Sequence, residues 1–215
     1  MSPRIWIVPL FLVLMASEAI AKLPSPDIAL EAAGTGNLSA LKQYQSKNGN
    51  LNAQNKQGIT PLMQAVARGQ KKAVDFLLQH KADLELQNKN GDTALVMALA
   101  NDQDAIAVQL IKAGAQTTVL GGENKNNLVF MAASTNCDQA LKLLVQKNPE
   151  LVNAQNQKGD TALHEAARFG SEKTLHILLA AGARKDLKNN EGKTPLELAK
   201  AQQNEAAIKL LNSKK

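Results

Sequence analysis

The chain has 215 residues, of which 44% are hydrophobic and only 3% aromatic, and it carries a formal net charge of +6 at pH 7. A substantial core can be buried, but so few aromatic rings argue against one central core and favour an array of small Ala- and Leu-rich helices. The lysines are scattered among acidic residues and form no block. The charge therefore does not indicate nucleic-acid binding; it favours solubility or an acidic partner surface.

The first 21 residues have the three-part layout of a secretory signal peptide. Arg4 supplies a positive end, residues 5–15 form an apolar run, and Ala19-Ile20-Ala21 places small residues where a signal peptidase cleaves. The apolar run is about half the roughly 20 residues that a membrane-spanning helix needs, which argues against an anchor. We therefore expect cleavage after Ala21 and a periplasmic or secreted protein.

The mature chain would begin at Lys22, and residues 22–26 are expected to form a short flexible leader. Removing the signal peptide takes away one basic and one acidic residue, so the net charge stays at +6. Export is a further argument against a nucleic-acid partner. No cysteine stands at the cleavage site for attachment of a lipid.

Near-copies of one short sequence recur along the rest of the chain. They are Gly58-Ile59-Thr60-Pro61-Leu62, Gly91-Asp92-Thr93-Ala94-Leu95, Gly159-Asp160-Thr161-Ala162-Leu163 and Gly192-Lys193-Thr194-Pro195-Leu196. The leucines of successive units, Leu128 included, are 33 residues apart, except for a step of 35 from Leu128 to Leu163. A fixed period of this length is typical of a helical repeat array.

The second unit shows how each repeat is expected to fold. Thr60 can cap a helix and Pro61 can occupy its first position, where the missing N–H costs nothing. Apolar and small residues then recur at helical spacing, and Gly69 ends the helix because glycine accepts a left-handed conformation. A second helix, an extended arm and a turn follow before Gly91 opens the next unit.

The chain divides into six such units, which are residues 27–57, 58–90, 91–123, 124–158, 159–191 and 192–215. The first lacks a Thr-Pro opening and the last is polar, as expected of terminal units that face water. The stretch 116–127 keeps the period but loses the usual turn residues. Gly121-Gly122 indicates a looser loop there, and this is the least regular connection in the array.

From about residue 27 to 211 the chain resembles an ankyrin-repeat protein. Residues 159–167 (GDTALHEAA) carry the likeness most clearly and depart from the family pattern chiefly in Ala162, which replaces a proline. The resemblance implies an all-α repeat solenoid of about six repeats. Each repeat would be a helix-turn-helix with a hairpin loop projecting at right angles, in a curved, L-shaped stack.

The chain offers little for catalysis or for binding a metal or cofactor. None of the histidines His80, His164 and His176 lies four residues from another, and none belongs to a His-Glu-x-x-His motif. His164 stands where the resemblance implies a structural histidine that bonds back to the helix start. His80 suits a helix C-terminus, and His176 is expected at the surface or partly buried. We predict no catalytic, cofactor or metal site.

The single cysteine, Cys137, cannot form an internal disulfide. It could pair with another molecule or react as a free thiol. Its position favours instead a small residue near the turn between the two helices of its unit.

We expect the function to reside in a surface, because the resemblance implies that hairpin tips and the exposed ends of the inner helices contact partners. Phe169 is a large apolar ring where its repeat-mates are mostly polar, and such rings often anchor interfaces; the alternative is packing on the neighbouring unit. Arg68 is well shaped for bidentate contact with a carboxylate. The candidate partner-binding residues are Arg68, Asn101, Ser134, Phe169, Lys56, Lys89 and Lys158.

The favoured function is a non-enzymatic protein–protein interaction module of the bacterial periplasm. It would be a monomer that binds a partner protein through its concave helix face and hairpin tips. It could act as an inhibitor or immunity protein that masks a toxin, or as a helper of an exported enzyme. One alternative is an enzyme with an unrecognised groove site, for which His164 or His176 would be tested. Another is a cytosolic nucleic-acid or scaffold protein, if the leader is not cleaved.

Overall fold

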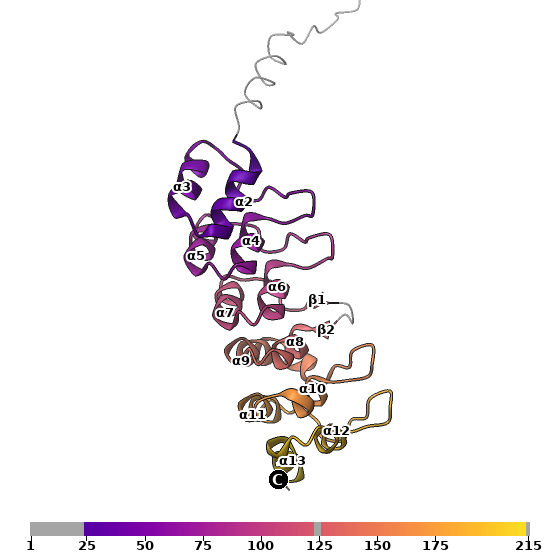
Figure 1. The fold of residues 1–215 in the computed structure, drawn as a ribbon. Coiled ribbons are helices and arrows are strands. Elements are labelled where there is room, and N and C mark those ends of the chain that lie inside the picture. The colour runs from indigo at the N-terminus through magenta and orange to yellow at the C-terminus, as the bar shows by residue number, and fades with distance from the viewer. Residues whose placement is uncertain (1–23, 123–125, 214–215) are drawn as a thin grey trace, which may run out of the picture.

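The computed structural model describes residues 24–122 and 126–213. The predicted signal peptide (1–21) and its cleavage site lie outside the described residues, as does the start of the predicted leader. Within the described part, twelve α-helices form six antiparallel pairs that stack one on another (Figure 1). The prediction of an all-α repeat solenoid is confirmed.

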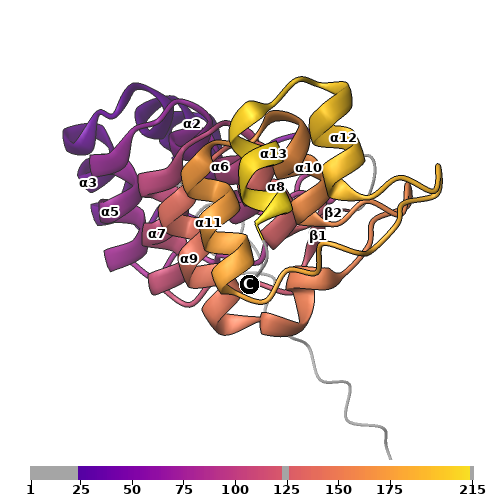
Figure 2. The same ribbon diagram turned by 90° about the horizontal axis from the view of Figure 1, so that it is seen from below.

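Each unit contributes one inner and one outer helix, and Figure 2 shows the two rows with the hairpin loops beyond the inner row. The inner helices are α2 (Pro26–Thr35), α4 (Pro61–Ala67), α6 (Ala94–Ala100), α8 (Leu128–Ser134), α10 (Ala162–Phe169) and α12 (Pro195–Ala201). The outer helices are α3 (Leu38–Ser46), α5 (Lys71–Gln79), α7 (Asp104–Lys112), α9 (Asp138–Lys147), α11 (Glu172–Ala180) and α13 (Glu205–Asn212).

The inner helices begin where the recurring threonines predict. Thr60 and its equivalents Thr93, Thr161 and Thr194 each accept a hydrogen bond from the backbone N–H three residues on, which satisfies one of the free donors of the helix start. Asn127 does the same for α8 through Phe130 N at 2.9 Å. The irregular fourth unit therefore keeps its helix start with a different capping residue.

The first unit lacks a Thr-Pro opening, as expected, but it still begins with a capped, proline-initiated helix. Ser25 is the N-cap of α2 and accepts a hydrogen bond from Asp27 N, and Pro26 is the first helical residue. Serine caps as well as threonine does, and proline is favoured at the first position. The repeat array thus starts inside the stretch 22–26 that we expected to be a leader.

Alanines let the inner helices approach one another closely. Ala65, Ala98, Ala132, Ala166 and Ala199 occupy equivalent positions in five successive units, and all five are fully buried. Because an alanine side chain is a single methyl group, two backbones can pack across it at close range. The core is therefore a continuous ribbon of Ala and Leu side chains along the stack.

The fourth unit absorbs its irregularities in two short elements. Strand β1 (Leu120–Gly121) pairs antiparallel with β2 (Asn126–Asn127), where we expected only a looser loop. The N-caps Thr93, Asn127 and Thr161 are 34 residues apart, so one extra residue lies before α8 and one after it. The 3₁₀ helix η1 (Pro149–Asn153) lies in the second, longer connection and buries Val152.

Side-chain hydrogen bonds connect the hairpin loops of adjacent units. Gln54 Nε2 donates to the carbonyl oxygens of Gly58 and Gln87, both at 2.9 Å. Gln155 repeats this arrangement toward the loop after it, donating to Gly159 O at 2.6 Å and to Lys188 O at 2.9 Å.

None of the described helices is long and apolar enough to cross a membrane.

Candidate interaction site on the inner-helix face

The structure places the predicted inner-helix residues at solvent-exposed points near the C-termini of the inner helices. Arg68, Asn101 and Phe169 are equivalent, because each lies eight residues after the N-cap of its helix, whereas Ser134 lies seven residues after Asn127. Arg68 and Asn101 are the C-caps of α4 and α6, while Ser134 and Phe169 are the last residues of α8 and α10. All four are exposed. Phe169 is 63% exposed, so it does not pack on the neighbouring unit.

A polar hollow of about 820 Å³ spans the fourth, fifth and sixth units. It brings together three of the predicted residues, Ser134, Phe169 and Lys158, with Gln202 of the last unit. Of the other predicted residues, Arg68, Asn101, Lys56 and Lys89 belong to the earlier units and do not line it. The predicted residues are thus divided between two stretches of the stack.

The turn after Phe169 differs from the equivalent turns of the other units. In four other units the residue after the inner-helix C-cap has a positive φ; these residues are Gly69 (64°), Asp102 (54°), Asn136 (54°) and Gln203 (56°). Gly170 instead has φ −71° and ψ 154°. Helix α10 consequently runs for eight residues where α8 has seven, and its added last residue is Phe169.

Gly170 is also required by space. A Cβ at this position would lie 2.5 Å from the carbonyl oxygen of Ala166. Only glycine fits this turn without displacing the end of α10, since real side chains do not approach a backbone oxygen so closely. The glycine therefore helps to place the Phe169 ring at the edge of the hollow.

Arg168, beside Phe169, was not among the predicted residues. Its guanidinium Nη1 lies 2.8 Å from Asp160 Oδ2 and 3.3 Å from Glu165 Oε2, and Nη2 lies 3.4 Å from Asp160 Oδ1. Asn189 Nδ2 donates to the same Asp160 carboxylate at 2.8 Å. Burial lowers the pKa of Arg168, but the hydrogen bond and charge of Asp160 outweigh it, so the pKa is raised overall.

The sequence did contain a sign of this cluster. The equivalents of Arg168, seven residues after the N-cap of each inner helix, are Ala67, Ala100 and Ala201 in three units and Ser134 in the fourth. A long charged side chain at an otherwise small position needs a partner, and the acid of the Gly-Asp-Thr opening provides it. Arg168, Asp160, Glu165 and Asn189 therefore form an ordered floor of the hollow in the unbound chain.

The charges of the hollow are of both signs. Asp160, Glu165 and Glu191 contribute carboxylates, while Lys158 and Arg168 contribute cations. Of these, Asp160 is only 2% exposed and is held by Arg168, so the groups that face solvent most freely are Lys158 and Glu191. Such a surface suits a mixed polar protein surface with an apolar contact at Phe169.

His164 closes the start of α10, as predicted for a structural histidine. Thr161 N donates to its Nδ1 at 3.1 Å, which leaves Nε2 to donate to Lys193 O at 3.0 Å. Burial lowers the pKa of the ring, so it stays neutral around pH 7. His176 lies on the outer helix α11 and is exposed. The two histidines are therefore on different faces and form no shared site.

Cys137 and His80 lie at the ends of outer helices. Cys137 is the fully buried N-cap of α9, close to the turn between the helices of its unit, and burial raises the pKa of its thiol to about 11. His80 is the C-cap of α5, with Nδ1 2.7 Å from Phe76 O. Among the described residues, no group of three or more His, Cys, Asp or Glu could hold a metal ion.

Residues 29–121, 107–189 and 128–215 match a protein-family model described as ankyrin repeats, in three overlapping copies. Two solved structures match this chain over 89% of its length, and each match covers 100% of the solved chain. The first, with a TM-score of 0.81 and 39% identity, comes from the Bd0816 predatory endopeptidase of Bdellovibrio bacteriovorus in complex with the immunity protein Bd3460. The second, an ankyrin repeat protein named EF0377, has a TM-score of 0.74 and 25% identity.

Similar sequences also occur inside much longer proteins. The human transient receptor potential cation channel subfamily A member 1 is 30% identical over 150 residues, which is 66% of this chain and 13% of that protein. Its Caenorhabditis elegans homologue is 36% identical over 90 residues, 42% of this chain and 7% of that protein. The chain thus spans a small part of these curated relatives, and the likeness concerns their repeats.

Proposed function

Because the chain belongs to the ankyrin-repeat family, whose repeats bind protein partners and are not typically catalytic, we propose that it is a non-enzymatic binding protein of the bacterial periplasm. It engages one partner protein through the polar hollow at the ends of α8, α10 and α12. The observation that carries this proposal is Phe169, a ring 63% exposed beside the fixed Arg168–Asp160 pair.

The hollow has the composition of a protein-binding surface. An aromatic anchor ringed by polar groups is the usual arrangement of an interface hot spot. Because Arg168 is already held by Asp160 and Glu165, its side chain loses little freedom on binding. A rigid surface of this kind gains affinity by reducing the entropy cost of association.

We further propose an immunity-type role, in which the chain masks an exported endopeptidase of its own cell. The likeness that supports this is the structure of an immunity protein in complex with a predatory endopeptidase, at 39% identity over 89% of this chain. The secretory layout of the first 21 residues supports the same compartment. A masking protein needs a rigid scaffold and no chemistry, as this chain provides.

The test is capture and inhibition with the mature chain, residues 22–215. The immobilised protein is incubated with the periplasmic fraction of the producing organism, and the captured proteins are crosslinked and identified. We expect one dominant partner with peptidase activity on a peptide substrate, and stoichiometric loss of that activity when the chain is added. A captured peptidase that stays fully active would contradict the immunity role while leaving the binding role in place.

Matched variants locate the contact. Phe169→Ala should weaken capture at least tenfold, while Ile28→Ala, which removes another exposed apolar side chain (47% exposed) on α2, should leave it unchanged. Both variants should melt within about 1 °C of the parent, since exposed substitutions have small effects on stability. Equal capture by the two variants would show that the hollow is not the binding site. N-terminal sequencing of the periplasmic protein should begin at Lys22.

A further inference from the structure

A second, separate surface lies on the outer helices, on the side away from the polar hollow. Three adjacent hollows lie between α7 and α9 (about 470 Å³), between α9 and α11 (about 650 Å³) and between α11 and α13 (about 290 Å³). The first two share Lys142 and Lys173, and the last two share His176 and Ala180. They therefore join into one path across four units, which we call the outer track.

No carboxylate lines any of the three hollows, but four lysines do: Lys112, Lys142, Lys173 and Lys185. Lys173 is paired with Asp138 at 3.1 Å, and Lys185 Nζ donates to backbone carbonyls at the end of α13, 3.0 Å from Ser213 O. Lys112 and Lys142 are exposed and have no ion pair within the described part of the chain. The track thus offers uncompensated positive charge.

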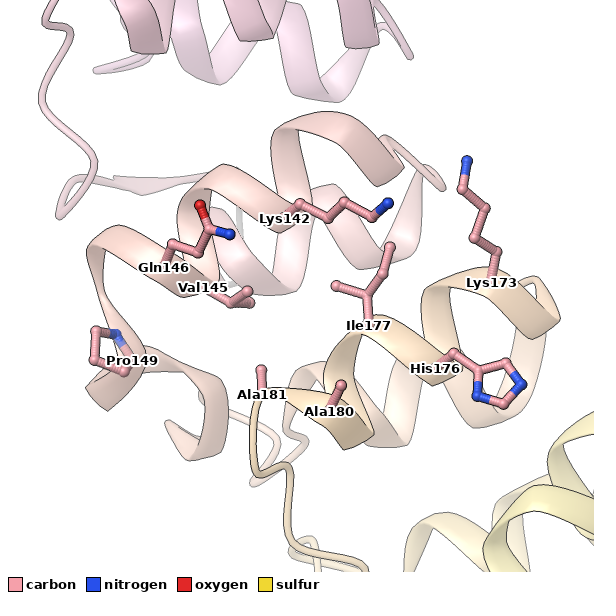
Figure 3. Close-up of a pocket in the computed structure, with 9 residues that line it drawn as sticks. All are labelled: Lys142, Val145, Gln146, Pro149, Lys173, His176, Ile177, Ala180 and Ala181. Atoms are coloured by element: carbon pink, nitrogen blue, oxygen red, sulfur yellow. The ribbon is translucent and has the colours of Figure 1, made fainter.

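The middle hollow has an apolar floor, shown in Figure 3. Val145 of α9 and Ile177 of α11 face each other there, and Ala180 and Ala181 continue the floor along α11. Pro149, the first residue of η1 just after α9, lines one end. The lysines and Gln146 stand at the rim, so an apolar group can enter between cations.

The two faces of the molecule therefore differ in charge. The polar hollow contains the carboxylates of Asp160, Glu165 and Glu191, whereas the lining of the outer track has none. An acidic segment would be attracted more strongly to the outer track, which has only cations, than to the polar hollow, where charges of both signs are present. The two surfaces can also be occupied at the same time, because they lie on opposite rows of helices (Figure 2).

We propose that the outer track binds an extended acidic segment of a second protein, with apolar side chains entering successive hollows. Neighbouring helices pack roughly 8–10 Å apart. An extended chain in the polyproline II conformation advances about 3.1 Å per residue with three residues per turn, so every third side chain faces the same side. The hollows are therefore spaced to accept an apolar side chain at about every third residue, with carboxylates between them facing Lys112 and Lys142. This inference does not depend on the proposed function of the inner face.

The proposal is tested with a defined peptide, four copies of Asp-Leu-Glu labelled with fluorescein, titrated with the mature chain in about 0.1 M salt and followed by anisotropy. Three control peptides replace the acids by lysine, replace the leucines by alanine, or place leucine at every second residue. We expect saturable binding of the first peptide, and at least tenfold weaker binding of each control.

Two variants of the protein complete the experiment. Lys142→Glu should weaken binding at least tenfold, and Ala180→Trp, which fills the middle hollow from an exposed position, should do the same. Lys72→Glu on α5 makes the same charge change outside the track and should leave affinity within twofold. Circular dichroism and melting should show that all three variants are folded.

Several results would overturn the proposal. One is no saturation by 1 mM protein, and another is equal binding of the lysine-substituted peptide. A third is binding that neither Lys142→Glu nor Ala180→Trp weakens. Sedimentation that finds Lys142-dependent self-association, or vesicles rich in anionic phospholipid that bind the chain while the peptide does not, would assign the track to a second copy or to a membrane surface instead.

Discussion

Replacing Arg168 by alanine should destabilise the fold by about 2 kcal/mol. The change leaves the Asp160 carboxylate, whose side chain is 3% exposed, with only Asn189 and the surrounding dipoles to stabilise its charge. Breaking a fully buried ion pair from one side costs roughly 3–5 kcal/mol. The lower figure of about 2 kcal/mol follows because the Arg168 side chain is 19% exposed, so water can reach the vacated space.

In a protein of this size each kcal/mol shifts the melting temperature by about 2–4 °C, so Arg168→Ala should melt about 4–8 °C below the parent. Thermal melting followed by circular dichroism gives this shift, and urea unfolding with an unchanged m-value checks it. Arg184→Ala is the matched control. Its ion pair with Asp186 has the short distance of 2.7 Å but is largely exposed, so no clear shift is expected.

A double-mutant cycle identifies the cause. Asp160→Asn removes the buried charge, and Arg168→Ala should then cost at least about 1 kcal/mol less than it does in the parent. A melting shift of Arg168→Ala no larger than that of Arg184→Ala would refute the claim that the pair orders the floor of the hollow. The claim would also be refuted if the effects of Arg168→Ala and Asp160→Asn on the free energy of unfolding add to within about 0.5 kcal/mol.

Three further predictions concern single residues. Gly170→Ala should lower the free energy of unfolding, measured in urea, by at least about 2 kcal/mol, because its Cβ would lie 2.5 Å from Ala166 O. Gly182→Ala should lower it by only about 1–2 kcal/mol, because Gly182 has a positive φ but open space around it. The pKa of His164 is lowered in the folded protein, so the stability it contributes is complete above about pH 6.5 and is lost as the pH falls below that value. Melting between pH 7.5 and 5 should therefore fall more steeply in the parent than in His164→Gln. Cys137, with its pKa raised to about 11, should react with Ellman's reagent at pH 8 only after unfolding.

Each of these has a contrary result. A stable Gly170→Ala would mean that the turn after α10 can relax. Parallel pH profiles for the parent and His164→Gln would mean that His164 does not titrate differently in the folded and unfolded chains. Rapid labelling of Cys137 in the folded protein would mean that α9 opens locally, which hydrogen exchange would detect.

The sequence predicted the fold well because each unit repeats its own helix-start chemistry. Thr60 and Pro61 define the beginning of α4 without reference to any other part of the chain. The first unit also starts with a capping residue before a proline, Ser25 and Pro26, but this pair lies two residues earlier in the repeat than Thr60 and Pro61. The physical function of the two pairs is the same, and a search for any capping residue before proline would have found both.

The interaction surface was only partly predictable. Phe169 was identified because an apolar ring departs from a polar position, but Arg168 was overlooked although it departs from a position of small residues in the same way. The turn at Gly170 was not predicted either, because the equivalent residues of other units have a positive φ while Gly170 adopts an extended conformation. The outer track depends on how side chains of four helices meet, which no single repeat encodes.

The glutamines that connect neighbouring loops bear on how the molecule responds to force. Gln54 and Gln155 each join one loop to the next and to none beyond it. In a stack held by nearest-neighbour contacts, tension applied to the two ends is carried through every junction in series. The array therefore behaves as a short spring, which can open by detaching one terminal unit while the others keep their contacts. A partner bound across several units would then lose its contacts one unit at a time under tension.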